Sequence, residues 1–227
     1  MDTWPAGTLL AALTDTDRAA LLRLGTGRPL GRGQTIIREG STGEDVFVIT
    51  AGSTKVFGDT YDGRTALLAL RVAGDIVGEL AALDAGRRSA TVVTCTVSTV
   101  RVIGRTAFDD FLRDRPDAAR AVQKSVVAKL RQATRLRIDA GGSSAVVRLA
   151  RLLAYLASRY GRDVPDGRAI DVPLSQTDLA AMAGISEPSV QRALGELRRR
   201  GLIASAYREI VVRDDAGLQM FSLGEAG

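Results

Sequence analysis

The chain contains no histidine, and Cys95 is its only cysteine. An intrachain disulfide is therefore impossible, and neither a Cys/His zinc site nor a Cys-ligated iron–sulfur cluster can be assembled. Catalytic triads that use histidine as the base are excluded as well, whereas lysine- or carboxylate-based catalysis is not. Cys95 lies in the β-branched run Ala90–Val97, which favours a role as a small buried apolar residue.

Long apolar runs are missing too. No segment approaches the roughly 20 residues that a membrane-spanning helix needs, and Met1–Pro5 lacks the basic and apolar regions of a secretory signal. Hydrophobic residues make up 45% of the chain and charged residues 25%, which is typical of a soluble globular protein. We expect a cytoplasmic protein with no membrane partner, and 227 residues suffice for one large or two ordinary domains.

Positive charge is concentrated toward the C-terminus. The net charge is +5, and Val146–Arg213 contains eleven Arg and no Lys against seven Asp or Glu, which is about +4 of that total. A basic region of this kind favours a polyanionic partner. By itself the signal is weak, because many basic surfaces are only solvated faces.

The first half of the sequence predicts a β-rich domain preceded by a helix. Pro5–Leu24 has helical spacing with a start at Thr14–Asp17, and from about Arg28 to Arg105 short β-branched segments alternate with Gly or Asp. Such a pattern is typical of a β-sandwich or a jelly-roll barrel. The expected strands are Thr35–Ile37, Val46–Ile49, Ser53–Phe57, Thr65–Leu70, Thr91–Val97 and Thr99–Ile103.

A long helix is predicted next. Residues 107–138 contain one proline, Pro116, and after it apolar positions recur every three or four residues at Ala119, Val122, Val126, Leu130 and Ala133. This narrow seam favours pairing of two helices from two subunits over burial in a broad core. The alternative is a helix that packs on its own barrel. Ala140–Ser144 then breaks the pattern and indicates a hinge or domain boundary.

The remainder is predicted to be helix-rich. Helices are expected at Val146–Tyr160, Gln176–Ala183 and Glu187–Arg199, followed by a β-hairpin or wing at Ile203–Val212. Asp214–Gly227 shows no pattern and is expected to be mobile. The expected organisation is a barrel domain at 1–115, a long helix at 116–140, a hinge at 141–145 and a C-terminal domain at 146–227.

One interruption of the strand pattern has the features of a phosphate site. Gly78 opens a short helical turn, Glu79–Leu83, whose first N–H groups are free to bind an anion. Arg88 and Ser89 follow shortly afterwards, and an arginine fork matches phosphate geometry. A carboxylate at Glu79 would repel the phosphate, so we expect it to face a ribose hydroxyl instead.

The segment Gly78-Glu79-Leu80-Ala81, followed by Arg88-Ser89-Ala90, resembles the phosphate-binding cassette of cyclic-nucleotide-binding domains. The spacing of Gly33, Gly40 and Gly52 is similar to that of the barrel of this family. The resemblance implies that Arg88 binds the cyclic phosphate, Glu79 takes the ribose 2′-hydroxyl and Ser89 contacts phosphate or base. Val77, Gly78 and Leu80 complete the expected binding set from this segment. The alternative is a barrel that kept the fold but lost the ligand, and the presence of both Arg88 and Glu79 favours binding.

Leu174–Leu197 has the pattern of two short crossed helices. The expected shared core is Leu179, Met182 or Ala183, Ile185, Val190 and Leu194. Ala180 allows close approach, Gly184 permits the turn, Ser186 is a good N-cap, and Pro188 fits the first turn of the second helix.

The second helix presents residue types that reach base edges, and Arg198–Ile203 leads from it into the wing. The expected outward residues are Glu187, Pro188, Ser189, Gln191 and Arg192. The alternative, a structural helix pair that does not bind DNA, is disfavoured by the wing and the basic bias.

From about residue 10 to residue 213 the two motifs together resemble the bacterial Crp/Fnr regulator family. The resemblance implies an α+β protein with an N-terminal jelly-roll β-barrel that binds a cyclic nucleotide, a long dimerisation helix and a C-terminal winged helix-turn-helix. Ser175 and Gln176 fall at the family's phosphate-contact positions, and Arg192 matches an arginine that reads guanine. Glu187 and Pro188 depart from the other base-reading residues of the family's cyclic AMP-dependent activator, so we predict a different or relaxed half-site.

The expected effector follows from the same resemblance. The family's adenine-contacting Thr-Ser pair aligns with Ala133-Thr134, which leaves Thr134 to serve alone. Cyclic AMP is the first choice, with cyclic GMP or another cyclic nucleotide as alternatives. Oxygen-sensing and haem-based members are disfavoured because one Cys and no His cannot supply their ligands, so we expect no metal, haem or iron–sulfur cluster.

The expected partners are double-stranded DNA, RNA polymerase and a second copy of the chain, joined along Ala119–Ala133. Ligand would favour the dimer state in which the two recognition helices lie one DNA turn apart, ~34 Å. One rival hypothesis is a regulator that binds DNA without a nucleotide. The other is an enzyme, or a nucleotide-sensing subunit of one; no catalytic constellation supports an enzyme, and the helix-turn-helix argues against a subunit.

Overall fold

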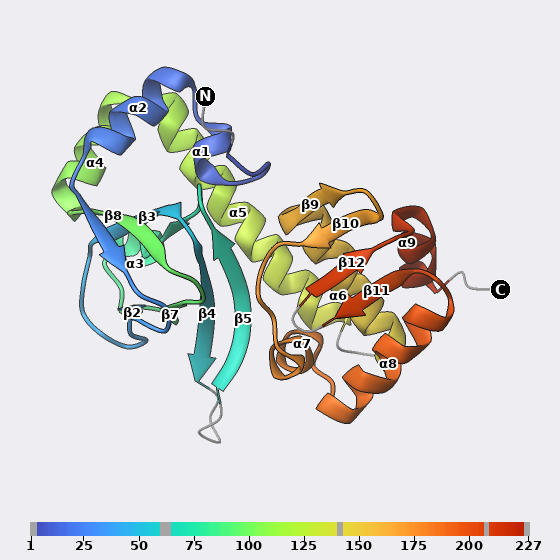
Figure 1. The fold of residues 1–227 in the computed structure, drawn as a ribbon. Helices are drawn as coiled ribbons and strands as arrows, with labels where there is room; N and C mark the ends of the chain where they lie inside the picture. Colours follow the sequence, from blue (N-terminus) through green and yellow to red (C-terminus); the bar gives the residue numbers. More distant parts are fainter. Residues whose placement is uncertain (1–3, 60–64, 140–142, 207–208, 225–227) are drawn as a thin grey trace. The chain divides into compact units, whose positions relative to one another are not determined.

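A computed structural model describes residues 4–59, 65–139, 143–206 and 209–224, apart from the side chains of residues 136, 137, 139 and 206. The chain forms two compact units, Met1–Arg131 and Gln132–Gly227, and the boundary falls inside helix α5 (Pro116–Asp139) (Figure 1). The predicted hinge at 141–145 lies partly outside the described residues, because these do not include residues 141 and 142. Ser144 within it forms the N-cap of the following helix.

The N-terminal unit contains the predicted jelly roll, built from two four-stranded sheets (Figure 1). One sheet has the order β1 (Thr26–Leu30), β8 (Ser98–Ile103), β3 (Val46–Ala51) and β6 (Ile76–Val77). The other has the order β2 (Thr35–Ile37), β7 (Thr91–Thr94), β4 (Ser53–Asp59) and β5 (Thr65–Val72). Neighbouring strands pair antiparallel, and apolar side chains of both sheets, including Ile37, Phe47 and Val100, share one core.

A strand lies in each of the six predicted segments, although the segment Thr91–Val97 is a strand only as far as Thr94, and two strands were missed. β1 contains Gly27 and Pro29, residues that are depleted in strands, yet it pairs with β8 along its whole length. β6 has only two residues, which is too short for a period to be recognised. Cys95 is buried, as the surrounding β-branched residues predicted.

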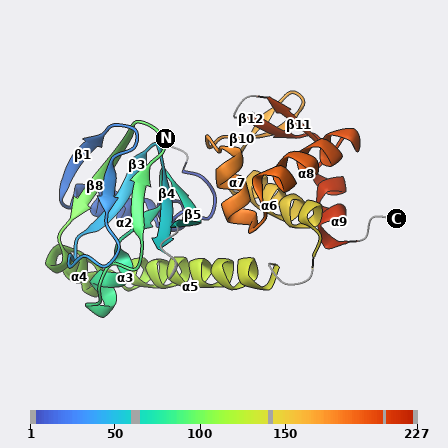
Figure 2. The ribbon, with the colours of Figure 1, turned by 90° about the horizontal axis from the view of Figure 1, so that it is seen from below.

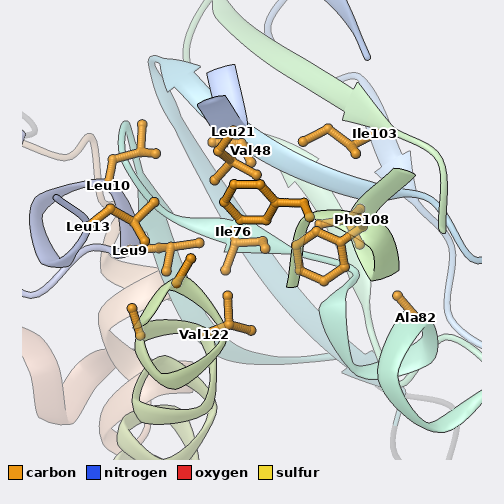
Figure 3. Packing of buried hydrophobic residues seen from close by; sticks show 14 residues of the cluster. Leu9, Leu10, Leu13, Leu21, Val48, Ile76, Ala82, Ile103, Phe108 and Val122 are labelled. Carbon is orange, nitrogen blue, oxygen red and sulfur yellow. The ribbon is translucent and has the colours of Figure 1, made fainter. Parts of the chain in front are cut away.

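A second apolar cluster joins the β1–β8–β3–β6 sheet to the helices of this unit, which are α1 (Leu9–Ala12), α2 (Asp15–Arg23), α3 (Glu79–Asp84), α4 (Arg105–Asp114) and the start of α5 (Figure 3). Figure 3 shows Phe108 of α4 among Leu21, Val48 and Ile76. Thr14 caps α2 as predicted, because its side chain accepts a hydrogen bond from the Asp17 amide.

Among the described residues of helix α5, the fully buried ones lie near its N-terminal end. Ala118, Ala121 and Val122 belong to the core of its own unit, so the packing of Val122 follows the alternative given above rather than an intersubunit seam. Farther along, Val127 and Leu130 are 46% and 66% exposed. None of the described helices is long and apolar enough to cross a membrane.

The C-terminal unit is built around helix α6 (Ala145–Tyr160), which Figure 2 shows among the other helices of the unit. These are α7 (Gln176–Ala183), α8 (Glu187–Arg199) and α9 (Asp215–Leu223). A four-stranded sheet has the order β11 (Ile203–Ala206), β12 (Glu209–Val212), β10 (Gly167–Ile170) and β9 (Gly161–Val164). The predicted wing is the β11–β12 hairpin, and the β9–β10 hairpin that extends it was not predicted.

The prediction of a mobile tail at Asp214–Gly227 is wrong for residues 214–224, and residues 225–227 lie outside the described part of the chain. Asp214 accepts a hydrogen bond from the Gly217 amide at 2.8 Å and so caps α9. Leu218 and Phe221 are buried against the unit, and the Arg200 guanidinium lies 4.8 Å from the centre of the Phe221 ring. Residues 215–224 are therefore part of the C-terminal core, and the cap at Asp214 was the signal that could have revealed them.

Candidate functional sites

The predicted phosphate cassette begins where β6 ends. Gly78 has a φ of +84° and stands at the N-terminus of α3 (Glu79–Asp84). A Cβ on this residue would lie 2.6 Å from Arg88 Nη1 and 2.9 Å from the Asp45 carbonyl oxygen. Both the left-handed backbone and the crowding therefore require glycine here, and the predicted helical turn after Gly78 is confirmed.

Arg88 is enclosed in the barrel, with 6% of its surface exposed. Its Nη1 donates to the Gly78 carbonyl at 2.8 Å and its Nη2 donates to the Asp45 carbonyl at 2.7 Å. The guanidinium carbon also lies 5.9 Å from the centre of the Phe47 ring. These contacts hold a positive charge beside the N-terminus of α3. Burial lowers the pKa of Arg88, an effect opposed chiefly by the charge of Asp45, and an arginine remains protonated regardless.

Glu79 is almost fully buried, at 3% exposure, and takes an ionic partner that the sequence did not reveal. Lys129 Nζ of α5 lies 2.8 Å from Glu79 Oε1 and donates to the Ile76 carbonyl at 2.6 Å. Burial lowers the pKa of the Lys129 ammonium, and the charge of Glu79 acts against that shift. Lys129 thus connects α5 with the cassette inside the N-terminal unit. In the sequence it is one of several cations along α5, and nothing distinguishes it from the exposed ones.

The structure brings Gly78, Glu79 and Arg88 together. Among the other predicted cassette residues, Val77 is buried, whereas Leu80 and Ser89 are exposed. Thr134 lies on an exposed part of α5 that belongs to the C-terminal unit, and its contact with a nucleotide stays a prediction.

The predicted helix pair forms as expected from its caps. Ser175 begins α7 in a capping box, in which its Oγ accepts from the Asp178 amide at 3.1 Å and its own amide donates to Asp178 Oδ2 at 2.7 Å. Gly184 ends the helix with a φ of +63°. Ser186 Oγ then accepts from the Ser189 amide at 3.3 Å and starts α8. Short-range chemistry therefore sets the turn between the helices.

The faces of this pair also follow the prediction. Leu179, Met182, Ala183, Val190 and Leu194 are buried, and Ile185 is half-buried. Glu187, Pro188, Gln191 and Arg192 are exposed, while Ser189, predicted to point outward, is half-buried because it lies against the cap at Ser186.

Polar contacts order the exposed face of α8. Gln191 Nε2 donates to Gln176 Oε1 at 3.0 Å, and Arg192 Nη2 donates to Ser189 Oγ at 3.1 Å. Thr177 Oγ1 donates to Glu187 Oε1 at 2.8 Å, so Thr177 positions a predicted DNA-contacting residue although the sequence did not single it out. Residues of α7 and α8 thus form one polar surface.

The arginine run that leads into the wing is partly neutralised. Arg199 and Arg200 both pair with Glu196, and they hold the pKa of that carboxyl below its usual range, Arg200 contributing most. Arg198 Nε donates to the Leu194 carbonyl at 3.3 Å. Part of the positive charge counted in the last third of the sequence therefore serves the fold.

Comparison with known proteins finds a matching family model over each of the two domains. Residues 28–115 match the family model of the cyclic nucleotide-binding domain, and residues 147–221 match that of the Crp-like helix-turn-helix domain. The chain belongs to the Crp/Fnr family of transcription regulators. It is a DNA-binding regulator that carries a cyclic nucleotide-binding domain, and the fold predicted from the resemblance is confirmed.

Several Crp/Fnr regulators are similar over most of their length. The CRP-like cAMP-activated global transcriptional regulator of Mycobacterium tuberculosis is 27% identical over 187 residues, 82% of this chain and 84% of that protein. A CRP-family transcriptional regulator of Thermus thermophilus has a TM-score of 0.70 at 26% identity, covering 86% of this chain and 96% of that one. The c-di-GMP responsive global regulator CLP of Xanthomonas campestris shares the fold, with a TM-score of 0.73 at 19% identity over 88% and 99% of the two chains.

Proposed function

We propose that this Crp/Fnr regulator binds a cyclic nucleotide, with cyclic AMP as the first choice, and that the nucleotide controls its affinity for DNA allosterically. The observation that carries the proposal is the buried Arg88 guanidinium, held by the carbonyls of Gly78 and Asp45 beside the buried carboxylate of Glu79. A buried arginine whose described hydrogen bonds go to backbone carbonyls rather than to a carboxylate suits an anionic ligand, because its charge is desolvated and its fork is already oriented.

In this proposal Arg88 binds the cyclic phosphate, together with the amides at the start of α3 and the Ser89 hydroxyl. Glu79 accepts a hydrogen bond from the ribose 2′-hydroxyl, and Lys129 holds that carboxylate in position. Val77, Gly78 and Leu80 shape the remaining wall. Lys129 is thus a positioning residue, and its substitution weakens nucleotide binding less than substitution of Arg88 does.

Titration calorimetry with cyclic AMP, cyclic GMP and a cyclic dinucleotide tests the site. We expect binding of cyclic AMP by the natural chain and its loss in Arg88→Leu. The matched control is Arg87→Leu, because Arg87 is the exposed neighbour and donates only to the Gly40 carbonyl in the described structure. Unchanged affinity in Arg88→Leu would show that the cassette is not the binding site.

The identity of the base is the open part of this proposal. Ala133 removes one hydroxyl from the pair that resembles the family's adenine contact, so selectivity for adenine rests on Thr134. The Mycobacterium tuberculosis relative is named as cAMP-activated, which supports cyclic AMP, whereas the Xanthomonas campestris protein responds to c-di-GMP. A cyclic dinucleotide that binds more tightly than cyclic AMP would replace the first choice.

We further propose a homodimer joined along the α5 helix, Ala119–Ala133. The exposed apolar side chains Val127 and Leu130 support it, because pairing two helices would remove them from water. Leu130→Glu is expected to shift sedimentation velocity toward the monomer. Met220→Glu, at another exposed apolar position, is the control and should leave the sedimentation coefficient unchanged.

Each protomer would place α8 in the major groove, with the two helices ~34 Å apart. Ser175, Gln176, Ser186 and Ser189 would contact the backbone and base edges together with Glu187, Pro188, Gln191 and Arg192. Selection from random DNA is expected to return a guanine opposite Arg192 and a half-site that differs at the steps read by Glu187 and Pro188. Recovery of the half-site of the family's cyclic AMP-dependent activator would contradict this prediction.

A nucleotide-independent regulator is the second candidate, favoured only by the departures at Ala133 and in α8. Fluorescence anisotropy with the selected operator separates the two. A nucleotide that controls binding shifts DNA affinity through a coupling of about 1–3 kcal/mol, whereas the second candidate binds DNA equally with and without it. We also propose that the chain regulates transcription through RNA polymerase and does not act as an enzyme. Cyclic AMP should therefore be recovered intact after incubation with the chain.

A further inference from the structure

The polar surface that α7 and α8 form carries a carboxylate that has no cationic partner among the described residues. It belongs to Glu187, which is exposed at the start of α8, with Ser186 and Pro188 exposed on either side. DNA phosphates repel a carboxylate. On a surface that faces DNA, this group therefore lowers the affinity for every sequence unless a donor in the groove meets it.

The Glu187 carboxylate is held in place from the neighbouring helix. Thr177 Oγ1, in the first turn of α7, donates to Glu187 Oε1 at 2.8 Å. The turn between the two helices is fixed by the left-handed backbone of Gly184, whose carbonyl accepts from Arg148 Nη2 at 2.8 Å. Because the hydrogen bond from Thr177 uses Oε1, Glu187 Oε2 remains available to a donor outside the chain.

A parallel contact orders the next turn of α8. Gln191 lies one turn after Glu187, and its Nε2 donates to Gln176 Oε1 at 3.0 Å. Two consecutive residues of α7 thus orient two residues on the same face of α8. Because these side chains are ordered before DNA binds, little affinity is lost to ordering them.

The edges of the base pairs decide what such a carboxylate can meet. In the major groove the exocyclic amino groups of cytosine and adenine are donors, whereas guanine and thymine present acceptors. Adenine places its N7 acceptor beside the amino group, an arrangement that suits an amide such as Gln191 better than a carboxylate. Cytosine presents only its N4 amino group in this groove and is therefore the base that fits Glu187.

We propose that Glu187, fixed by Thr177, makes cytosine the required base at one base pair of each half-site. The inference rests on the placement of α8 in the major groove proposed above. Glu187 Oε2 accepts from the cytosine amino group, and the same carboxylate repels the acceptors of guanine and thymine, so specificity comes from exclusion as well as from attraction. Thr177 acts through Glu187 and is a positioning residue.

Competition anisotropy with the full chain tests this inference. The probe is the operator returned by selection, with cyclic AMP present, and the competitors carry each single-base change in one half-site. We expect the natural chain to prefer cytosine at one position by about tenfold over the other bases. In Glu187→Ala this preference should fall below about twofold while the other positions keep theirs. Affinity for unrelated DNA should rise in that variant, because a repulsion from the phosphates is gone.

Variants of Thr177 separate positioning from a structural role. Thr177→Ala should lower the cytosine preference by about threefold at the same position and leave the affinity for unrelated DNA unchanged. Thr177→Ser keeps the hydroxyl and should restore the preference. Asp166→Asn removes an exposed carboxylate from the turn between β9 and β10, so it controls for charge and should alter no base preference.

The outcomes separate this inference from the proposed docking of α8. Arg192→Ala should abolish the preference for guanine at another position. If it does so while Glu187→Ala leaves every preference unchanged, or if the position that responds to Glu187→Ala requires a base other than cytosine, the inference is overturned. An unchanged preference in Thr177→Ala overturns the positioning role. If neither Arg192→Ala nor Glu187→Ala changes any base preference, α8 does not enter the groove and the proposed docking fails as well.

Discussion

Replacing Lys129 by methionine removes the ammonium that neutralises Glu79 but keeps most of the apolar stem. The side chains of Lys129 and Glu79 are 20% and 4% exposed, and their charged atoms are 2.8 Å apart. Removing one partner of a buried ion pair leaves an uncompensated charge, which costs about 3–5 kcal/mol. Because Lys129 retains some contact with water, we expect the lower end, a loss of about 3 kcal/mol in the free energy of unfolding of the N-terminal unit.

Urea unfolding followed by tryptophan fluorescence measures this loss. Trp4 is the only tryptophan, and it packs against the core of the N-terminal unit, so its emission reports on that unit. Lys124→Met, on the exposed side of the same helix, is the control and should change stability by no more than ~0.5 kcal/mol.

A double variant separates the ion pair from simple packing. In Lys129→Met with Glu79→Gln the buried carboxylate is gone, so the double variant should be more stable than Lys129→Met alone by about 2 kcal/mol. A loss below ~1 kcal/mol in Lys129→Met, or a double variant that is less stable than the single one, would refute the reasoning.

Three further predictions concern other parts of the fold. Hydrogen bonds to Asp17, chiefly from Arg115 and then from Thr14, hold the pKa of this carboxyl below its usual range. The carboxylate therefore stabilises the folded state above the usual pKa of an aspartate, and this contribution is lost as the pH falls through the lowered pKa. Asp17→Asn should therefore lower the midpoint of thermal unfolding at pH 7, and the difference from the natural chain should shrink below pH 4. Thermal scans at a series of pH values measure this difference. A difference that does not vary with pH would contradict the prediction. Gly78→Ala should destabilise the N-terminal unit by at least ~1–2 kcal/mol because Gly78 has a left-handed backbone, and urea unfolding measures this loss. The added Cβ should also displace Arg88 and so weaken cyclic nucleotide binding, which calorimetry measures. An unchanged affinity for the nucleotide would argue against the role of the turn. Phe221→Ala should lower the free energy of unfolding of the C-terminal unit by about 3–5 kcal/mol, because Phe221 is only 7% exposed. If thermal unfolding showed almost no loss of stability, α9 would not be part of the core.

Much of this protein could be predicted from short-range patterns. The alternation of apolar residues located six strands, and Ser175, Gly184 and Ser186 defined α7 and α8 because caps and turns act over three or four residues. Gly78 and Arg88 likewise marked the cassette, because a glycine that opens a helical turn and an arginine that can bind phosphate are both recognisable in the local sequence.

Other features were decided by contacts between distant segments. β1 exists because β8 pairs with it, although Gly27 and Pro29 argue against a strand. Glu79 and Lys129 are 50 positions apart in the sequence. Only the packing of α5 on the barrel buries the Glu79 carboxylate and brings the Lys129 ammonium to it. The sequence by itself therefore determined the elements, their caps and the family's binding motifs, whereas the tertiary structure decided which charges are buried and what neutralises them.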